Sequence, residues 1–381
     1  MADKYTKAAL LTLQSLPKSQ NTLQGPFQET MWIVVDVLEL ASGDHEAAAK
    51  MISVHCLASS QYGVNLDTPL QHGAKKLDPH TYEWCLKLLT EALRVDTSKH
   101  VVHALSVLLT HSPEGTFKTS QAAFSESLSG LNNAAITRNV DDIDLQRETL
   151  NYALCLCIDK PVFVRTADMG NLLSLLAGFL QPSTHIGAQT YPDIFHSIVK
   201  VVMALIRNRR DLIVLNLPHL AVVFCLLLNS LTNPLENLGQ RQYRSISCRL
   251  PSWISLSQPL GGEEAALLSR LLVGLTTKTA IRGMGTAFAP YETGKDVQSL
   301  AKPFGKHASC VVAAYIGLLN DPLCHIDRET RAELTPGLFA LCGMLGEKGR
   351  DALMPILDNG GKAIFKTLWS SYESQKYVGQ G

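Results

Sequence analysis

The apolar residues of this 381-residue chain recur at helical spacing almost from end to end, and this periodicity constrains the fold more than any other feature. Within 79–94, for example, Tyr82, Leu86, Leu89 and Leu93 step by three and four residues, which is the signature of a helix that buries one face. No part of the sequence shows the successive alternation of apolar and polar residues that strands require. The sequence therefore predicts an all-α protein.

The predicted helices are mostly separated by short loops and cover residues 3–16, 27–41, 44–60, 79–94, 98–111, 119–136, 145–158, 168–180, 191–208, 217–231, 262–281, 302–320, 328–346, 348–358 and 360–377. Stacked antiparallel helix pairs, as in an irregular HEAT- or armadillo-like α-solenoid, would bury the apolar face of each pair against the next. A globular all-α bundle is the alternative, since the sequence has no repeat of fixed period. Pro336 is expected to kink its helix or displace its start.

Two polar interruptions suggest how the chain is divided. Residues 181–190 form a polar turn, and 233–262 combine three prolines and three arginines with little helical period. We expect an N-terminal helical-repeat region at 1–180 and a C-terminal helical domain at 181–381, with a long irregular loop at 233–262. Long loops inside compact helical proteins are uncommon and often functional.

Composition indicates a folded chain that is kept reduced. Leucine occurs 59 times and charged residues make up only 18% of the chain, so neighbouring parts or partners must cover much of it. Such a chain is not intrinsically disordered. The nine cysteines are odd in number and have no repeated spacing, which favours an intracellular protein without a disulfide framework. The N-terminus lacks the apolar core of a signal peptide.

The apolar segment at 212–231 approaches the length of a membrane span. Asn216 is a good N-cap and Pro218 is suited to a first helical turn, so the helix is expected to begin near Leu217. A helix from there to Leu231 covers ~22 Å, less than the ~30 Å of a hydrocarbon core. We therefore expect a helix buried by its neighbours, with no membrane contact.

The zero net charge of the chain conceals an uneven distribution. Residues 1–160 carry 13 basic and 18 acidic side chains, a net charge of −5, whereas 200–306 carry 13 and 6, a net charge of +7. Arginine forks pair with phosphate in two-point geometry, and Tyr243 and Trp253 could stack on unpaired bases. The candidate contacts with RNA or an acidic partner are Arg207, Arg209, Arg210, Arg241, Arg244, Arg249, Lys278, Arg282, Lys302 and Lys306. The alternative, that these side chains pair with acidic neighbours or only face solvent, stays open.

The sequence offers no constellation for catalysis. It contains no Walker-type loop, no G-x-S-x-G elbow and no paired C-x-x-C motifs, and the glycines at 283–285 do not complete a dinucleotide fingerprint. His100 and His103 share a helical face, but no further ligand accompanies them there. We expect a protein that is not an enzyme and that uses no cofactor, metal or small-molecule substrate.

Several C-terminal motifs carry a family resemblance. The sequence reads R-x-x-L-x-P-G-L-F-A-L at 331–341, G-R-D-A-L-M at 349–354 and A-I-F-K-T-L-W-x-x-Y at 363–372, with N-L-P-H-L at 216–220 and L-S-R-L-L-V-G-L-T at 268–276 upstream. These motifs resemble the C-terminal domain of the nucleolar pre-rRNA-processing family known as unhealthy ribosome biogenesis protein 2.

The resemblance covers roughly 210–381 and implies a helical-repeat scaffold in early assembly of the large (60S) ribosomal subunit. It implies a nucleolar complex with pre-60S assembly factors, among them a DEAD-box helicase, and contact with pre-rRNA. Members of the family are much longer, which implies that this chain lacks most of their N-terminal solenoid. The family has no catalytic residues to carry over. The alternative is a cytosolic HEAT-like adaptor that binds proteins without RNA contact.

The last helix also contains two candidate partner-docking residues, Tyr372 and Tyr377. Aromatic side chains at the end of a helical stack either meet a partner or complete the terminal core. The sequence favours completion of the core, because Phe365, Leu368 and Trp369 form an apolar face on the same helix.

Overall fold

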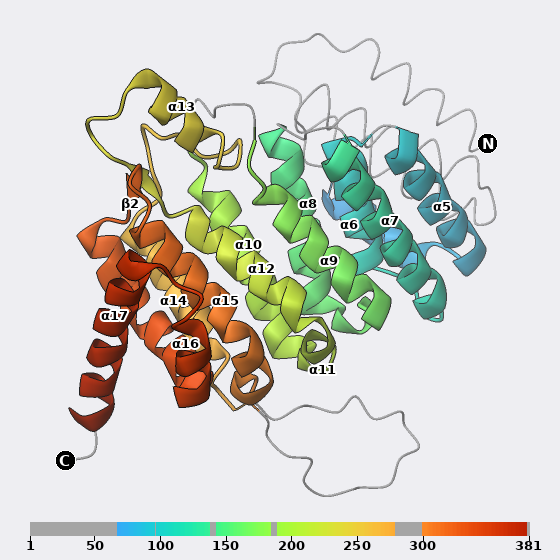
Figure 1. Cartoon of the computed structure of the whole chain (residues 1–381). Coiled ribbons are helices and arrows are strands. Elements are labelled where there is room, and N and C mark those ends of the chain that lie inside the picture. The colour runs from blue at the N-terminus through green and yellow to red at the C-terminus, as the bar shows by residue number, and fades with distance from the viewer. Residues whose placement is uncertain (1–66, 96, 138–141, 184–188, 279–298, 379–381) are drawn as a thin grey trace, which may run out of the picture. The chain divides into compact units, whose positions relative to one another are not determined.

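The computed structural model describes residues 67–95, 97–137, 142–183, 189–278 and 299–378 (Figure 1). These residues are almost entirely helical, which confirms the all-α prediction. The helices expected at 3–16, 27–41 and 44–60 lie outside the described residues. The chain forms two compact units, unit 1 at Met1–Asp168 and unit 2 at Met169–Gly381. The boundary expected between residues 180 and 181 lies just after a helix that ends at Phe179. The two units divide near the start of that helix, between Asp168 and Met169.

Unit 1 contains α4 (Asp67–Lys76), α5 (Pro79–Val95), α6 (Lys99–Thr110), α7 (Phe117–Thr137), α8 (Ile143–Asp159) and the 3-10 turn η1 (Pro161–Phe163). Helix α5 lies beside α7, and α6 lies between α4 and α8. Alternate helices therefore pack side by side, as stacked helix pairs require. Helix α4 was not predicted, because its residues are largely polar and show little apolar periodicity.

Helix α5 shows why the sequence forms these elements. The Oδ1 atom of Asp78 accepts hydrogen bonds from the N–H groups of His80 and Thr81, both at 3.0 Å, and so caps the first turn. The predicted apolar stripe is buried. The hydroxyl of Tyr82 donates to the carbonyl of Leu108 at 3.2 Å, which satisfies its polar atom inside the core.

Unit 2 begins within α9 (Thr166–Phe179) and continues with α10 (Pro192–Asn208), α11 (Arg210–Ile213), η2 (Val214–Asn216), α12 (Leu217–Asn229), β1 (Asn233–Pro234), α13 (Gln240–Ser247), α14 (Gly262–Gly274), α15 (Ala301–Leu319), β2 (Cys324–His325), α16 (Arg328–Leu353) and α17 (Asn359–Val378). Helix α14 packs between α10 and α16, and α15 packs between α12 and α17. A regular solenoid stays a prediction, although alternate helices lie side by side in both units.

The segment at 233–262 is more ordered than its sequence suggests. It contains β1, which pairs antiparallel with β2, and the eight-residue helix α13. The N–H of Gly239 donates to Oε1 of Gln242 at 3.1 Å and so satisfies a donor at the start of α13. A helix this short and this polar leaves no periodic apolar signal in the sequence.

The kink or shifted start expected from Pro336 is wrong, because α16 begins at Arg328 and continues through this proline; its break lies at Gly346, where the predicted helix 328–346 ends. Gly346 has a φ of 64°, a left-handed conformation that glycine adopts without steric cost. Beyond Pro336, the N–H of Gly337 donates to Oγ of Ser269 on α14 at 2.9 Å. A side chain at Gly337 would come within 2.8 Å of the Cα atom of Ser269, so the two helices meet at close backbone contact.

The helical run Arg210–Asn229 is, within the described part of the chain, the one helix long and apolar enough to cross a membrane. It spans 20 residues with a mean hydropathy of 2.2, and half of its most apolar window is buried inside the protein. Helix α12 itself has 13 residues, and its Leu220, Phe224 and Leu228 are completely buried. We interpret this run as a core element of unit 2, because its apolar face already packs against neighbouring helices.

Candidate nucleic-acid and partner interfaces

Helix α13 exposes a row of polar side chains at one end of unit 2. Its residues from Arg241 to Ser245 are all exposed, whereas Ile246 and Ser247 are buried. The C-terminal turn of the helix is therefore anchored in the protein, and the preceding turns face solvent. This arrangement presents basic side chains on a fixed element rather than on a free loop.

The segment that follows α13 is pinned to α9 and to the start of α10. Nε1 of Trp253 donates to the carbonyl of Phe179 at 2.7 Å. The N–H of Tyr191 donates to the carbonyl of Trp253 at 3.0 Å, and the N–H of Ser183 donates to that of Leu250 at 2.9 Å. Trp253 is completely buried, so the prediction that it stacks on unpaired bases is wrong. Its indole is a structural anchor.

Arg241, Tyr243 and Arg244, which we call the α13 group, form the exposed basic part of this helix. The two arginines are three residues apart and therefore lie on the same face. Among the described residues, neither guanidinium makes an ion pair or hydrogen bond. Tyr243 is 38% exposed. Arg249 differs, because its Nη1 lies 2.5 Å from Oδ2 of Asp321, which partly neutralises its charge.

The remaining candidate contact residues that the structure describes, apart from Arg249, lie at the opposite end of unit 2. Helices α10 and α14 run in the same direction: Nε2 of His196 contacts Oε1 of Glu264 at 3.0 Å near their starts. Just past their ends, Nη1 of Arg210 donates to the carbonyl of Thr277 at 3.0 Å. Tyr191, next to the start of α10, holds the segment that follows α13. Helices α13 and α11 therefore lie at opposite ends of unit 2 (Figure 1).

The exposed basic residues at this second end are Arg207, Lys278, Lys302 and Lys306, which we call the α11-end group. The two lysines of α15 belong here because the opposite end of α15 leads to β2, which pairs with β1 beside the α13 segment. Helix α10 has 17 residues, which separates the two groups by roughly 25 Å. The described candidate contacts of the basic stretch are therefore divided between two surfaces in the structure.

Two arginines at the second end are engaged within the protein. Arg209 pairs with Asp211 at 3.1 Å. Arg210 is only 5% exposed, and its guanidinium donates to two backbone carbonyls. The prediction that Arg210 contacts RNA is therefore wrong, because packing of α11 turns its side chain inward. Arg282 lies outside the described residues.

Tyr372 packs within the protein. Its ring centroid lies 5.4 Å from that of Trp369 and 6.0 Å from that of Phe339 on α16. The side chain is half-buried, which fits completion of the terminal core better than docking of a partner. Tyr377 lies on α17, but its side chain is outside the described residues.

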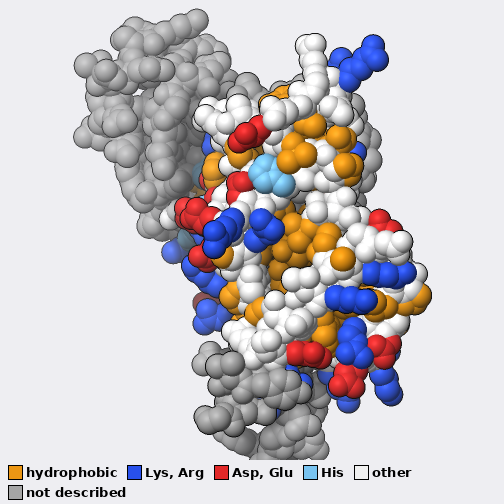
Figure 2. All heavy atoms as spheres, turned by 60° about the vertical axis from the view of Figure 1, so that its left-hand side comes forward, with side chains coloured by type: hydrophobic (Ala, Val, Ile, Leu, Met, Phe, Trp, Pro, Cys, Tyr) orange, Lys and Arg blue, Asp and Glu red, His pale blue; other side chains and the backbone are white. Residues whose placement is uncertain are grey.

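Figure 2 shows the side of the molecule on which α17 lies in Figure 1, where basic side chains are interspersed with acidic and hydrophobic ones. Arg350 is an example: its guanidinium contacts Asp351 at 2.9 Å and Glu373 at 4.0 Å, and lies 5.5 Å from the ring centroid of Trp369. Internal pairing of this kind gives a mixed surface rather than a continuous basic patch.

Unit 1 contains a groove of about 600 Å³ that sequence reasoning missed. It is lined by the last turns of α5, by Arg165 and by a face of α7 made largely of small residues, namely Ala122, Ser125, Ser129, Gly130, Asn133 and Ala134. These residues recur at intervals of three and four, a signal that is present in the sequence. Arg94, which pairs with Glu126, places both signs of charge in the groove. The lining selects no class of ligand.

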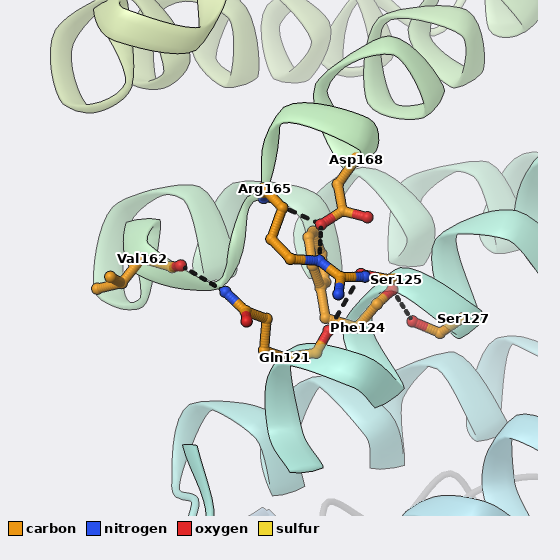
Figure 3. Close-up of polar contacts among 7 residues, drawn as sticks. All are labelled: Gln121, Phe124, Ser125, Ser127, Val162, Arg165 and Asp168. Atoms are coloured by element: carbon orange, nitrogen blue, oxygen red, sulfur yellow. Dashed lines mark hydrogen bonds and ion pairs between the residues drawn. The ribbon is translucent and has the colours of Figure 1, made fainter. Parts of the chain in front are cut away.

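Arg165 is held in this groove by a small polar network (Figure 3). Oδ2 of Asp168 accepts hydrogen bonds from the backbone N–H of Arg165 at 3.0 Å and from its Nε at 3.1 Å. Nη2 of Arg165 donates to Oγ of Ser125 on α7. Asp168 is 2% exposed, so this carboxylate depends on its internal donors.

An Asp168→Ala variant is expected to lower the free energy of unfolding by about 2 kcal/mol, because a buried network loses its shared acceptor. The ion-pair part of this loss is small, since the Arg165 side chain is 46% exposed and screened by water. Denaturant unfolding followed by circular dichroism measures the change. Asp168→Asn, which keeps one acceptor oxygen, is the control and should lose less than half as much. Equal stability of the alanine variant and the unaltered chain would contradict the role given to Asp168.

In the residues that the structure describes, the fold and these surfaces define an all-α protein that exposes arginine-bearing elements. The profile of the Urb2/Npa2 family matches residues 147–380, which is more than half of the chain. The chain therefore belongs to the Urb2/Npa2 family. No curated protein matches the sequence. The family match begins within α8, upstream of the region in which the sequence motifs resemble the family. Membership of this family implies a role in ribosome biogenesis.

Proposed function

We propose that the chain is a non-enzymatic nucleolar scaffold in the maturation of the large (60S) ribosomal subunit. In this role it holds pre-60S assembly factors, among them a DEAD-box helicase, and contacts pre-rRNA. The role requires no cofactor, metal, small-molecule substrate or membrane. The α13 group carries the RNA part of the proposal, and family membership supports the part in ribosome assembly.

The α13 group suits a single-stranded RNA segment for three reasons. Arg241 and Arg244 present two guanidinium forks on one face, and such forks bind phosphate in bidentate geometry. Tyr243 offers a ring on which an unpaired base can stack. The helix is anchored through Ile246 and the segment around Trp253, so little freedom is lost on binding.

A fluorescently tagged full chain, expressed in eukaryotic cells, tests this proposal. We expect the protein to concentrate in the nucleolus and ultraviolet crosslinking to recover precursors of the large-subunit rRNA. Exclusion from the nucleolus, together with an absence of rRNA crosslinks, would contradict the proposal and favour the cytosolic adaptor. With purified protein, the logarithm of the RNA affinity should fall linearly with the logarithm of the salt concentration, because phosphate contacts release counterions.

A further inference from the structure

Two cysteines on neighbouring helices of unit 2 form a pair that the proposed function does not use. Cys225 lies in the middle of α12 and Cys310 in the middle of α15, and these helices pack side by side. The ring centroids of Phe224 and Phe304 lie 5.6 Å apart and help to hold the two helices together. The paired strands β1 and β2 join the ends of the same helices. The cysteine pair therefore occupies a fixed interface between two well-packed elements.

The Cys225 thiol reaches the backbone of Cys310 across this interface. The Sγ atom of Cys225 donates to the backbone carbonyl of Cys310 at 3.8 Å, and Sγ of Cys310 donates to the carbonyl of His307 at 2.9 Å. Cys310 is exposed and Cys225 is half-buried. Reagents in solution can thus reach Cys310, and the Cys225 thiol is held beside its backbone on α12.

The environment of the pair also makes Cys310 the more reactive of the two cysteines. The neighbouring Cys225 thiol lowers the pKa of Cys310 to about 7, and the same interaction, together with burial, raises the pKa of Cys225. A large part of Cys310 is therefore thiolate near neutral pH, and the thiolate is the form that attacks disulfides and peroxides. Cys225 is suited to act second, as the thiol that resolves an adduct on Cys310.

We propose that Cys225 and Cys310 are a redox-active dithiol, which a low-molecular-weight disulfide such as oxidised glutathione converts into a disulfide between α12 and α15. The Cys310 thiolate attacks one sulfur of the reagent, whose S–S bond breaks and releases one thiolate. Cys225 then loses its proton to that thiolate and attacks the Cys310 sulfur, which releases the second half of the reagent as a thiolate that takes a proton from water. Two protein thiols are oxidised, and one reagent disulfide is reduced to two thiols.

This crosslink would restrain a large part of unit 2. The two cysteines are 85 residues apart in sequence, and the closed loop includes α13 and α14. A disulfide that closes a loop of this length removes much conformational entropy from the unfolded chain. We expect oxidation to raise the midpoint of thermal unfolding by roughly 10 °C.

Peptide mapping of the full chain under non-reducing conditions tests the proposal after treatment with oxidised glutathione at pH 7. We expect a disulfide-linked peptide pair that contains Cys225 and Cys310, together with the loss of two titratable thiols. Cys225→Ser should instead retain one glutathione on Cys310, because the resolving thiol is missing. Cys248→Ser, which removes an exposed cysteine at the α13 end, should form the crosslink as the unaltered chain does.

Two results would overturn the proposal. One is a glutathione adduct that persists on Cys310 in the unaltered chain, which would show that Cys225 does not reach it. The other is a Cys310 crosslink to a different cysteine. Neither result bears on RNA binding or nucleolar localisation, so the redox proposal and the proposed function are tested separately.

Discussion

An Arg241→Glu/Arg244→Glu double variant is expected to bind single-stranded pre-rRNA fragments about 30-fold more weakly than the unaltered chain. Each lost phosphate contact is worth ~1 kcal/mol at an exposed site, and ~2 kcal/mol corresponds to that factor. Because two phosphates are no longer neutralised, the slope of log affinity against log salt should become shallower by about 1.4. Fluorescence anisotropy over a series of salt concentrations measures both quantities.

Arg249 is left unaltered in this variant for a structural reason. Its guanidinium pairs with Asp321, and a glutamate in its place would set two carboxylates against each other. Like charges at such short range destabilise the folded state. A triple reversal that included Arg249 would therefore mix lost RNA contacts with lost stability, whereas the α13 double variant changes only exposed side chains.

The matched control reverses the same amount of charge at the other end of unit 2. Arg207→Glu/Lys278→Glu alters two exposed residues of the α11-end group, roughly 25 Å from α13 along α10. At physiological salt the Debye length is about 8 Å, so this variant should weaken binding by less than about 3-fold. An equal loss in both double variants would refute the α13 assignment, since affinity would then follow net charge.

Replacement of the buried indole, Trp253→Ala, should produce the largest loss of stability, about 4 kcal/mol. The side chain is completely buried, and its Nε1 donates to the carbonyl of Phe179 at 2.7 Å. The substitution leaves a cavity and an unsatisfied carbonyl. Chemical denaturation followed by circular dichroism measures the loss. The variant should also exchange the amide hydrogens of α13 faster.

Two control variants separate the contributions to this effect. Trp253→Phe keeps most of the packing and removes the hydrogen bond, so it should cost about 1–2 kcal/mol. Tyr243→Ala removes an exposed aromatic ring from the same segment and should change stability by less than about 0.5 kcal/mol. If Trp253→Ala lost no more than Tyr243→Ala, the indole would not be the anchor of this segment.

These two predictions are linked. Trp253 holds the segment that carries α13, so Trp253→Ala is expected to weaken RNA binding although the indole cannot reach RNA. The double arginine variant should weaken RNA binding without any loss of stability. If Trp253→Ala weakened RNA binding without losing stability, and the double arginine variant lost stability, then Trp253 would be the RNA contact and the arginines the structural anchor.

The sequence predicted a helix well where the helix contains capping residues and an apolar stripe of its own. Helix α5 lies within one residue of its expected bounds because Asp78 and Pro79 mark its start and a leucine stripe marks its buried face. Helix α13 was missed because its eight residues are mostly polar. The break in α16 at Gly346 falls where the predicted helix 328–346 ends, whereas the kink or shifted start assigned to Pro336 does not appear.

The exposure of the charged and aromatic residues could not be predicted in the same way. Trp253 and Arg210 lie among arginines and other polar residues mixed with apolar ones, and both are buried by segments far from them along the chain. Trp253 meets Phe179 of α9, and Arg210 meets Thr277 beyond α14. Such contacts join residues about 70 positions apart, so no local pattern encodes them.

The sequence by itself determined that this chain is all-α, where most of its helices lie, and which family it resembles. It also revealed the basic stretch hidden by zero net charge. Only the tertiary structure decided that the described candidate contacts of this stretch are divided between two surfaces, that Arg210 and Trp253 are internal, and that Cys225 meets Cys310. The physical reason is the distance along the chain over which the interactions act. Helix formation depends on neighbours three and four residues apart, whereas the position and exposure of a side chain depend on the direction in which each helix is packed.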